Sequence, residues 1–267
     1  MALFKLFNKP KKKVHKRVIK RKIKIKPKLI KKPKPKPLKP KPEIKKKVKI
    51  AAREAKIEIK KMPDENAYEM LKRYKIPLAD YAFCKKEEDL KDAFKKIGFP
   101  CVMKVSGDII HKTNVNGVRL NIASEDEALK TFKELIKIKG CNKVLVQKMI
   151  TEGYEIIVGG KKDPQFNRVV ALGAGGIFTE FLKDVSFRVC PVSRSDAEEM
   201  LKEVKFSDLI LKGFRGQKPA DANSIIETIL AVSRIMENNP QIKELDINPL
   251  FALPTQALAA DVRIILD

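Results

Sequence analysis

The sequence predicts an α/β protein of about 206 residues that follows a long basic extension. Three observations lead to this prediction. The chain has 267 residues and a net charge of +25, but residues 1–61 hold 27 of its 58 Lys and Arg residues and only three acidic ones. The rest of the chain is therefore nearly neutral and large enough to bury a sizeable core. In residues 62–267, segments of helical spacing alternate with short apolar runs.

The first part of the body alternates helix and strand. Asp64 follows a proline and is expected to be the N-cap of a helix that reaches residue 74. A strand is predicted over 81–84, a helix over 87–97 and a buried strand over 100–105. The predicted fold class is thus α/β with elements that alternate along the chain.

Capping boxes mark two of the later helices. Ser124 is followed three residues later by Glu127, and Ser195 by Glu198, which is typical of a helix start. A further helix is expected over 224–236. The remaining strands are predicted over 144–146, 155–158, 169–172, 244–247 and 258–264.

Residues 1–61 form a Lys/Pro-rich segment without Gly, Ser or Thr. Its like charges and prolines oppose a packed core, so we expect it to be largely disordered, apart from a helix over 43–61. One interpretation is a solvated extension that adds solubility. The other is a segment that binds nucleic acid or an anionic surface by counterion release. No apolar run is long enough for a transmembrane span, and a cytoplasmic protein is expected.

The body contains one histidine, His111, within the polar segment 106–117 between two predicted strands. A neutral imidazole is a competent nucleophile toward phosphorus, and the next residue, Lys112, carries a charge that attracts phosphate oxygens. An exposed loop histidine without a function is the alternative. Lys104 ends an apolar strand, where an unpaired ammonium is costly, so it is expected to reach a phosphate or a carboxylate.

Two further segments suggest oxyanion and metal sites. Residues 173–176 are rich in glycine and offer backbone donors, although a tight turn explains the pattern equally well. Asp246, Asn248 and Asp261 are expected at adjacent strand ends. Asn248 and Asp261 supply the hard oxygen ligands that suit Mg²⁺, whereas an Asx turn explains Asn248 alone.

Five segments, in this order, carry a family resemblance: SGDIIHKTNVNGV, EGYEIIVGGKKDPQF, ALGAGGIFTEFLKDVSFRVCP, KGFRGQKPAD and IKELDINPL with AADVRI. They resemble the β subunit of ADP-forming acetate–CoA ligases, which are related to succinyl-CoA synthetases. The resemblance covers about residues 62–267. It implies an ATP-grasp fold of two α+β lobes, residues 62–146 with a swinging histidine loop and residues 147–267 with the magnesium-binding end.

By this resemblance, the protein is a ligase that uses ATP or ADP with Mg²⁺. The implied reaction reversibly converts acetyl-CoA or another acyl-CoA, together with ADP and phosphate, into the free acid, ATP and CoA. A separate CoA-binding α subunit, in an α2β2 heterotetramer, binds the acyl group and phosphate and carries its own phosphorylated histidine. Phosphate then passes to His111 and to ADP. The alternative is a degenerate ATP-grasp scaffold that binds nucleic acid or anionic surfaces through residues 1–61.

The resemblance also assigns residues. His111 is the phosphorylated residue, Asp246 lies near it, and Arg188 steadies phosphate. Asn248 and Asp261 are the magnesium ligands. The nucleotide is expected to contact Lys104, Ser106, Gln147, Met149, Glu155, Gly175 and Gly176.

The chain departs from the usual family loop at three positions. Gly107 stands for Pro, Asn114 for Asp and Asn116 for Gly. Asn116 is compatible with the motif because Asn adopts left-handed backbone conformations more readily than most residues. Loss of the carboxylate at residue 114 is expected to alter loop docking or the basicity of His111.

Overall fold

A computed structural model describes residues 60–175, 184–214 and 216–267. The basic extension therefore lies outside the described residues, except for Lys60 and Lys61. These two residues form a short strand, β1, rather than the end of a helix. Within the described part of the chain, no helix has the length and apolar composition that crossing a membrane requires.

Six α-helices and one 3₁₀ turn occur in the described residues. They are α2 (Asp64–Arg73), α3 (Glu88–Ile97), η2 (Thr113–Val115), α4 (Glu125–Leu135), α6 (Arg194–Glu203), α7 (Ser207–Lys212) and α8 (Ala222–Asn238). The strands are β1 (Lys60–Lys61), β2 (Tyr81–Cys84), β3 (Cys101–Gly107), β4 (Val118–Ile122), β5 (Cys141–Lys148), β6 (Tyr154–Asp163), β7 (Asn167–Ala174), β8 (Val185–Val189), β9 (Ile242–Ala252), β10 (Ala257–Ala259) and β11 (Val262–Leu266).

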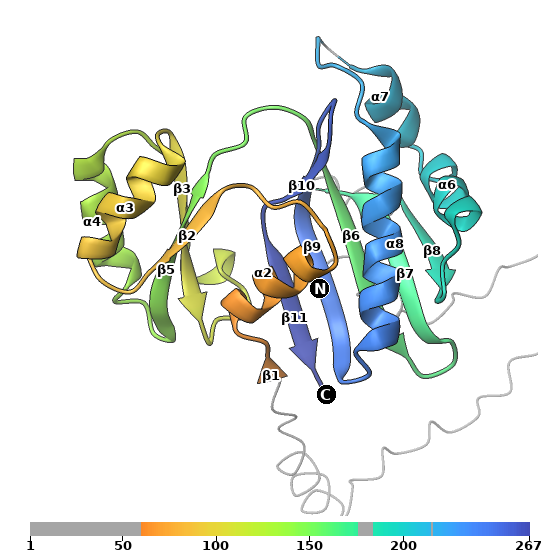
Figure 1. Ribbon diagram of the computed structural model, residues 1–267, viewed down its shortest axis with the longest axis horizontal. Coiled ribbons are helices and arrows are strands. Elements are labelled where there is room, and N and C mark those ends of the chain that lie inside the picture. The colour runs from red at the N-terminus through yellow and green to blue at the C-terminus, as the bar shows by residue number, and fades with distance from the viewer. Residues whose placement is uncertain (1–59, 176–183, 215) are drawn as a thin grey trace, which may run out of the picture. The chain divides into compact units, whose positions relative to one another are not determined.

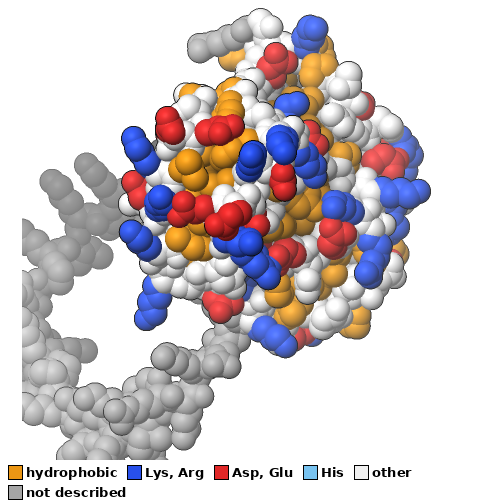
Figure 2. All heavy atoms as spheres, turned by 60° about the vertical axis from the view of Figure 1, so that its left-hand side comes forward, with side chains coloured by type: hydrophobic (Ala, Val, Ile, Leu, Met, Phe, Trp, Pro, Cys, Tyr) orange, Lys and Arg blue, Asp and Glu red, His pale blue; other side chains and the backbone are white. Residues whose placement is uncertain are grey.

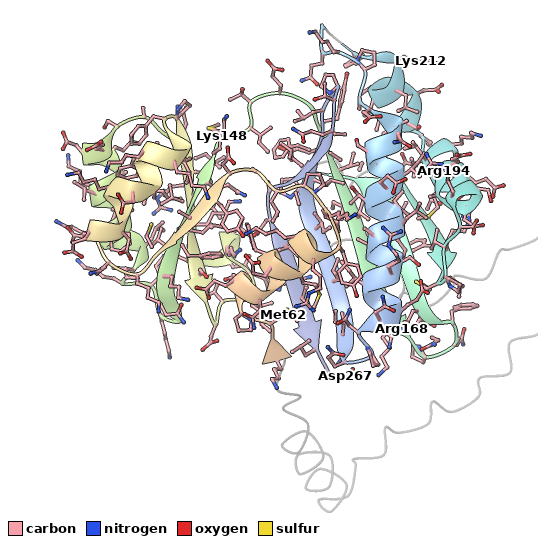
Figure 3. All side chains as sticks on the ribbon, viewed as in Figure 1. Met62, Lys148, Arg168, Arg194, Lys212 and Asp267 are labelled. Carbon is pink, nitrogen blue, oxygen red and sulfur yellow. The ribbon has the colours of Figure 1, made fainter. Side chains whose placement is uncertain are left out.

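The strands form two antiparallel sheets (Figure 1). The larger sheet has the order β1-β11-β9-β6-β7-β8, with β10 paired to β9. The smaller sheet has the order β2-β5-β3-β4. Lys148, labelled in Figure 3, ends β5, after which the chain passes to β6 in the larger sheet. The two sheets and the helices that accompany them confirm the predicted mixture of helices and sheets.

The larger core lies between the large sheet and its helices. In Figure 1, α8 runs along one face of the sheet, where Ile229 and Ile235 are buried against strand residues such as Leu245. Helix α2 precedes the small sheet in sequence but also packs on this core through Tyr68 and Leu71. The segment before β2 therefore stabilises the large sheet, and burial of each such side chain contributes about 2 kcal/mol.

The smaller core lies between the four-stranded sheet and helices α3 and α4. Leu90 and Phe94 of α3 and Phe132 of α4 pack against Met103 and Val146. Acidic and basic side chains are interspersed over the face drawn in Figure 2. This mixture agrees with the nearly neutral composition of the body.

Most predicted elements are confirmed, with differences at their ends. Helix α2 begins with Asp64, but its N-cap is Pro63, and the Asp64 side chain makes no capping bond. The second predicted capping box is wrong by two residues, because Ser193 and Asp196 form it instead. Ser124 does cap α4, since its hydroxyl accepts a hydrogen bond from the Glu127 N–H. Strand β4 is the strand expected after the His111 segment, although no bounds were predicted for it. Strand β8 and helix α7 are not among the predicted elements.

The predicted strand over 258–264 is divided in the structure. Strand β10 ends at Ala259 and β11 begins at Val262, so Ala260 and Asp261 form a break between them. Strand β9, in contrast, continues through Asn248 to Ala252. Asp246 and Asn248 therefore lie within a strand rather than at its end, and Asp261 faces them from the break.

Candidate active site

A pocket of about 510 Å³ opens where the loop between β3 and β4 meets β9 and the break before β11. Six lining residues bear on the chemistry: His111, Lys112, Asp246, Asn248, Asp261 and Arg263. Four of these were predicted as site residues, and His111 is far in sequence from the other three, Asp246, Asn248 and Asp261. The fold thus brings the half-buried His111 ring to the two predicted magnesium ligands.

The His111 loop has a specific backbone that the chain's unusual residues allow. Gly107 has φ 144°, and a Cβ there would lie 2.2 Å from the Gly140 carbonyl oxygen. Proline, with φ fixed near −65°, is incompatible with this position. Asn116 has φ 50° and ψ 37°, which confirms the left-handed conformation expected of it. The loop closes through the Gly117 N–H, which donates to the Lys112 carbonyl at 2.7 Å.

Lys112 connects the loop to both sides of the pocket. Its ammonium lies 2.6 Å from Asp261 Oδ1 and 3.6 Å from Asp64 Oδ1. Burial opposes the Lys112 charge, but the carboxylates of Asp261 and Asp64 outweigh it and raise the pKa of Lys112. Burial likewise opposes the Asp261 charge, but Lys112 and Lys104 hold the pKa of Asp261 below its ordinary value.

Asp64 organises the base of the loop. Its Oδ2 accepts hydrogen bonds from the Ser106 hydroxyl at 2.8 Å and the Gly107 N–H at 3.2 Å. Its Oδ1 lies 2.8 Å from the ammonium of Lys61, which also donates to the Gly107 carbonyl. Ser106, predicted to contact nucleotide, is thus engaged with Asp64. The Asp64 side chain is buried, and it charge-pairs with Lys61 and Lys112.

Asp246 lies beside a second ion pair at the pocket. Arg263 Nη2 is 2.6 Å from Glu244 Oε1 and 3.4 Å from Asp246 Oδ2. Burial raises the pKa of Asp246, whereas Arg263 acts in the opposite direction. Two acidic side chains therefore share one guanidinium, which orients the Asp246 carboxylate within the pocket wall.

Asn248 and Asp261 are held together by the backbone, because the Asn248 N–H donates to the Asp261 carbonyl at 3.1 Å. Both side chains line the pocket. The Asp261 carboxylate already contacts a cation, the Lys112 ammonium, so this position suits positive charge. Among the described residues, no three His, Cys, Asp or Glu side chains cluster as a complete metal site. An amide oxygen and one carboxylate fit Mg²⁺ whose other ligands are phosphates and water.

Lys104 and Gln147, both predicted to bind nucleotide, are in direct contact. The Lys104 ammonium donates to Gln147 Oε1 at 2.7 Å and to the Ala260 carbonyl at 2.9 Å. Burial lowers the pKa of Lys104 to about 8, despite the opposing effect of Asp261. Met149 follows β5 and is half-buried. Lys104 therefore connects the small sheet to the residue next to Asp261.

Glu155 and Gly175 meet near the start of β6, where Glu155 pairs with Phe251 of β9. The Gly175 N–H donates to the Glu155 carbonyl at 2.8 Å, and a Cβ on Gly175 would lie 2.6 Å from the same carbonyl. Glycine is therefore required for this close approach. The Glu155 side chain is exposed. Gly176 lies outside the described residues.

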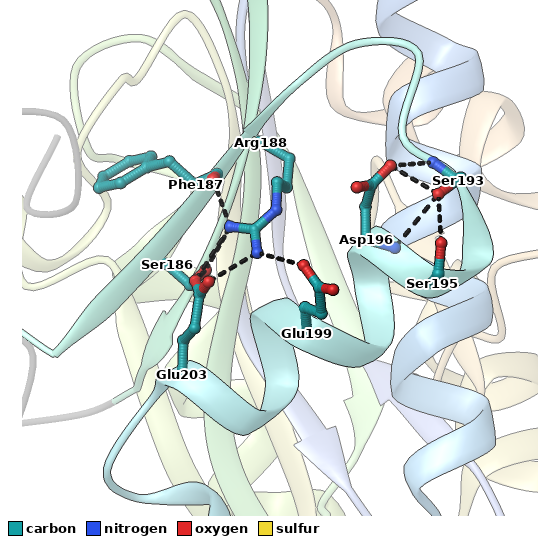
Figure 4. A network of polar contacts seen from close by, with 8 residues as sticks. All are labelled: Ser186, Phe187, Arg188, Ser193, Ser195, Asp196, Glu199 and Glu203. Atoms are coloured by element: carbon teal, nitrogen blue, oxygen red, sulfur yellow. Dashed lines mark hydrogen bonds and ion pairs between the residues drawn. The ribbon is translucent and has the colours of Figure 1, made fainter.

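Arg188 lies apart from the pocket residues, on the edge strand β8 (Figure 4). Its guanidinium is bound by two acidic side chains of α6, at 2.6 Å from Glu203 Oε1 and 3.2 Å from Glu199 Oε2. The Arg188 guanidinium, which the family resemblance assigned to phosphate, is thus paired with glutamates in this structure.

The sequence interpretation did not identify Lys61, Asp64 or Arg263 as site residues. Arg263 lies in the AADVRI segment, two residues after Asp261. Because side chains two apart on a strand point to the same side, this spacing could have indicated that Arg263 lies near the site. Asp64 lies 42 residues before Ser106, and no local pattern connects them. Only the packing of α2 beside the small sheet reveals that contact.

Residues 53–266 match the ATP-grasp domain family. The chain is 41% identical over 221 residues to the β subunit of acetate–CoA ligase (ADP-forming) I of Pyrococcus furiosus, covering 80% of this chain and 95% of that one. It is 40% identical over 204 residues to acetate–CoA ligase (ADP-forming) I of Archaeoglobus fulgidus. There the match covers 74% of this chain but 30% of the longer relative.

Structures of acetyl-coenzyme A synthetase 1 of Ca. Korarchaeum cryptofilum are also similar. One contains coenzyme A and Mg-AMPPCP, with the phosphohistidine segment pointing towards the nucleotide binding site (TM-score 0.68, 37% identity, 84% of this chain and 99% of that one). Another has this segment phosphorylated in the site I orientation (TM-score 0.69, 36% identity, the same coverage). The family match and these relatives agree with the predicted enzyme class. The chain therefore belongs to the ATP-grasp family and, within it, groups with the β subunits of ADP-forming acetate–CoA ligases.

Proposed function

We propose that this chain is the nucleotide-binding subunit of an ADP-forming acyl-CoA ligase and passes a phosphoryl group between His111 and ADP. The observation that carries the proposal is that His111 lines the same pocket as Asn248 and Asp261. A nucleophile and two oxygen ligands for a divalent cation meet there. The family membership supports the same class of reaction.

The chemistry at His111 is a pair of displacements at phosphorus. A neutral ring nitrogen of His111 attacks the phosphoryl group carried by the partner's histidine, a P–N bond to His111 forms, and the P–N bond to the donor histidine breaks. In the second displacement a terminal phosphate oxygen of ADP attacks the same phosphorus and the P–N bond breaks. The Lys61, Lys112 and Arg263 charges at the pocket favour the negative phosphoryl group.

Asn248 and Asp261 would hold Mg²⁺, which when bound neutralises the phosphate charge of the nucleotide. Lys104 would contact the nucleotide phosphates, and Gln147 with Met149 would lie against the base. Glu155, Gly175 and Gly176 are proposed to complete the nucleotide site.

His111 must also exchange phosphate with a partner, so we propose that its loop swings. The two phosphohistidine orientations of the Korarchaeum enzyme support this movement. In this chain His111 faces the Asp261 side, and Asp246 is proposed to act near the phosphorylated ring. The partner would be a cytoplasmic CoA-binding α subunit in an α2β2 assembly, which supplies acyl-CoA and phosphate. Because Arg188 is paired with Glu199 and Glu203, we propose no role for Arg188 in this reaction.

The experiment is labelling of the full chain with γ-labelled ATP and Mg²⁺. We expect an acid-labile, alkali-stable phosphoryl group that is lost in His111→Ala. His15→Ala is the matched control, because His15 is the chain's other histidine, and it should keep the label. Label that survives in His111→Ala, or that never forms on wild-type protein, would overturn the proposal.

A further inference from the structure

Lys112, the neighbour of His111, is a charged side chain of the loop that is buried in the body. Only 8% of it is exposed, although lysine is usually a surface residue. Its ammonium contacts Asp261 at 2.6 Å and Asp64 at 3.6 Å. The loop that carries His111 is therefore attached to the body through the side chain next to that histidine.

The attachment is electrostatic, and it involves three ammonium groups and two carboxylates. Lys61, Lys104 and Lys112 surround the two carboxylates of Asp64 and Asp261. An ammonium in such a buried place is retained only with a close partner. Asp261 gives Lys112 its shortest ion pair, so this carboxylate contributes more than Asp64 to holding the Lys112 ammonium.

The same Asp261 carboxylate is a proposed ligand of a divalent cation. A cation bound at Oδ1 would face the Lys112 ammonium within contact distance. Two positive charges that close repel each other strongly at the effective dielectric of a protein. Lys112 and a divalent cation are therefore competitors for Asp261, whereas Asp64 does not line the pocket and keeps its contacts with Lys112 and Lys61.

We propose that Lys112 is a positioning residue that docks the His111 loop onto Asp261, and that a divalent cation at Asp261 displaces it and loosens the loop. The inference rests on the proposed function for the position of the cation. Because coupling between two binding events is reciprocal, removal of the Lys112 charge must strengthen cation binding by the factor by which the cation weakens loop docking.

A purely structural ion pair makes a different prediction. If Lys112 only stabilises the fold, its loss lowers stability and leaves cation affinity unchanged. Lys143 provides the matched control, because it pairs with Glu65, the residue after Asp64, and carries the same charge. Lys143 does not contact Asp261.

The experiment measures Mn²⁺ binding to the full chain by electron paramagnetic resonance of the free ion, with and without ADP. We expect Lys112→Met to bind Mn²⁺ about tenfold more tightly than wild type, a typical size for coupling between sites. Lys143→Met should stay within about twofold of wild type, and Lys112→Arg should remain close to it because the charge is kept. Asp261→Asn should lose the site. Equal affinities for Lys112→Met and Lys143→Met, or a site that survives in Asp261→Asn, overturn the proposal.

Amide hydrogen exchange of residues 107–118 gives a second readout. Mn²⁺ should speed exchange in wild type, whereas Lys112→Met should exchange rapidly at any Mn²⁺ concentration. Circular dichroism checks that each variant is folded. A wild-type loop that Mn²⁺ leaves equally protected contradicts displacement. Neither measurement needs phosphoryl transfer or an α subunit, so an unlabelled His111 together with a shifted Mn²⁺ affinity would reject the proposed function and keep this inference.

Discussion

Two ion-pair networks of this protein are built from basic and acidic side chains, but one lies at the surface and the other is buried. Around Arg188, the arginine side chain is 21% exposed, and the side chains of its partners Glu199 and Glu203 are 65% and 49% exposed. Around Asp64, the Lys61, Lys112 and Asp64 side chains are at most 8% exposed. The Arg188 network joins β8 to α6 (Figure 4), whereas the Asp64 network joins α2, the His111 loop and the break before β11.

The two networks contain similar charges. They differ in how deeply the charged side chains are buried and in how many cations share each carboxylate, and these two properties point to the Asp64 network as the candidate binding site. Arg188 has two acidic partners within hydrogen-bond distance, and they compete with a ligand for its charge. In the Asp64 network three lysines serve two carboxylates, and one carboxylate opens to a pocket. That surplus of positive charge suits phosphate, and the accessible carboxylate suits a metal ion.

The largest expected effect comes from breaking the buried network at Asp64. Asp64→Asn leaves Lys61 and Lys112 without their shared carboxylate, and loss of one partner of a buried pair costs about 3 kcal/mol of unfolding free energy. Urea unfolding followed by circular dichroism measures this cost. Glu65→Gln is the control, since Glu65 is the next residue and 37% exposed, and should cost less than about 1 kcal/mol. Equal losses for the two variants would remove the distinction between the networks.

A smaller effect is expected from pH at Lys104. Burial lowers the pKa of Lys104 to about 8, so the ammonium loses its proton as pH rises through this value. ADP binding that depends on this charge should therefore weaken about tenfold between pH 7 and 9.5. Lys104→Arg keeps its charge and should show a flatter profile. Calorimetric titration with ADP measures both profiles, and identical slopes would show that Lys104 does not bind the phosphates.

The smallest effect is expected from Arg188→Gln. An exposed ion pair contributes at most about 1 kcal/mol, and salt should reduce it further. The Arg188 hydrogen bond lowers the pKa of Glu203 to about 2, so its stabilisation is present at neutral pH and is lost as pH falls toward 2. Thermal unfolding of variant and wild type should therefore converge in acid. A strong loss of phosphoryl transfer in this variant would instead restore a catalytic interpretation of Arg188.

Much of the fold is predictable because local patterns agree with it. The spacing of apolar residues identifies α2, α3 and α8, and Ser124 correctly marks the start of α4. Where two local signals compete, the prediction is wrong. Ser193 and Ser195 both precede an acidic residue by three positions, and the helix begins after Ser193, which forms the capping box with Asp196.

The candidate site is predictable where motifs are continuous and not where the contacts span long distances in sequence. His111, Asn248 and Asp261 lie in recognisable segments, and they do line one pocket. Apolar residues run from 258 to 264 with Asp261 among them, so periodicity alone misses the break that exposes this carboxylate to the pocket. The role of Asp64 depends on how α2 packs, which no local pattern encodes.

The central claim is that a phosphoryl group passes between His111 and a nucleotide held near Asp261. The most direct test is a chase: labelled wild-type chain is freed of nucleotide, the phosphorylated residue is identified by peptide mass spectrometry, and ADP is added with Mg²⁺. Our account predicts that the label is on His111 and moves into ATP. Label that resides on another residue, or that stays on His111 after ADP and Mg²⁺ are added, would contradict it.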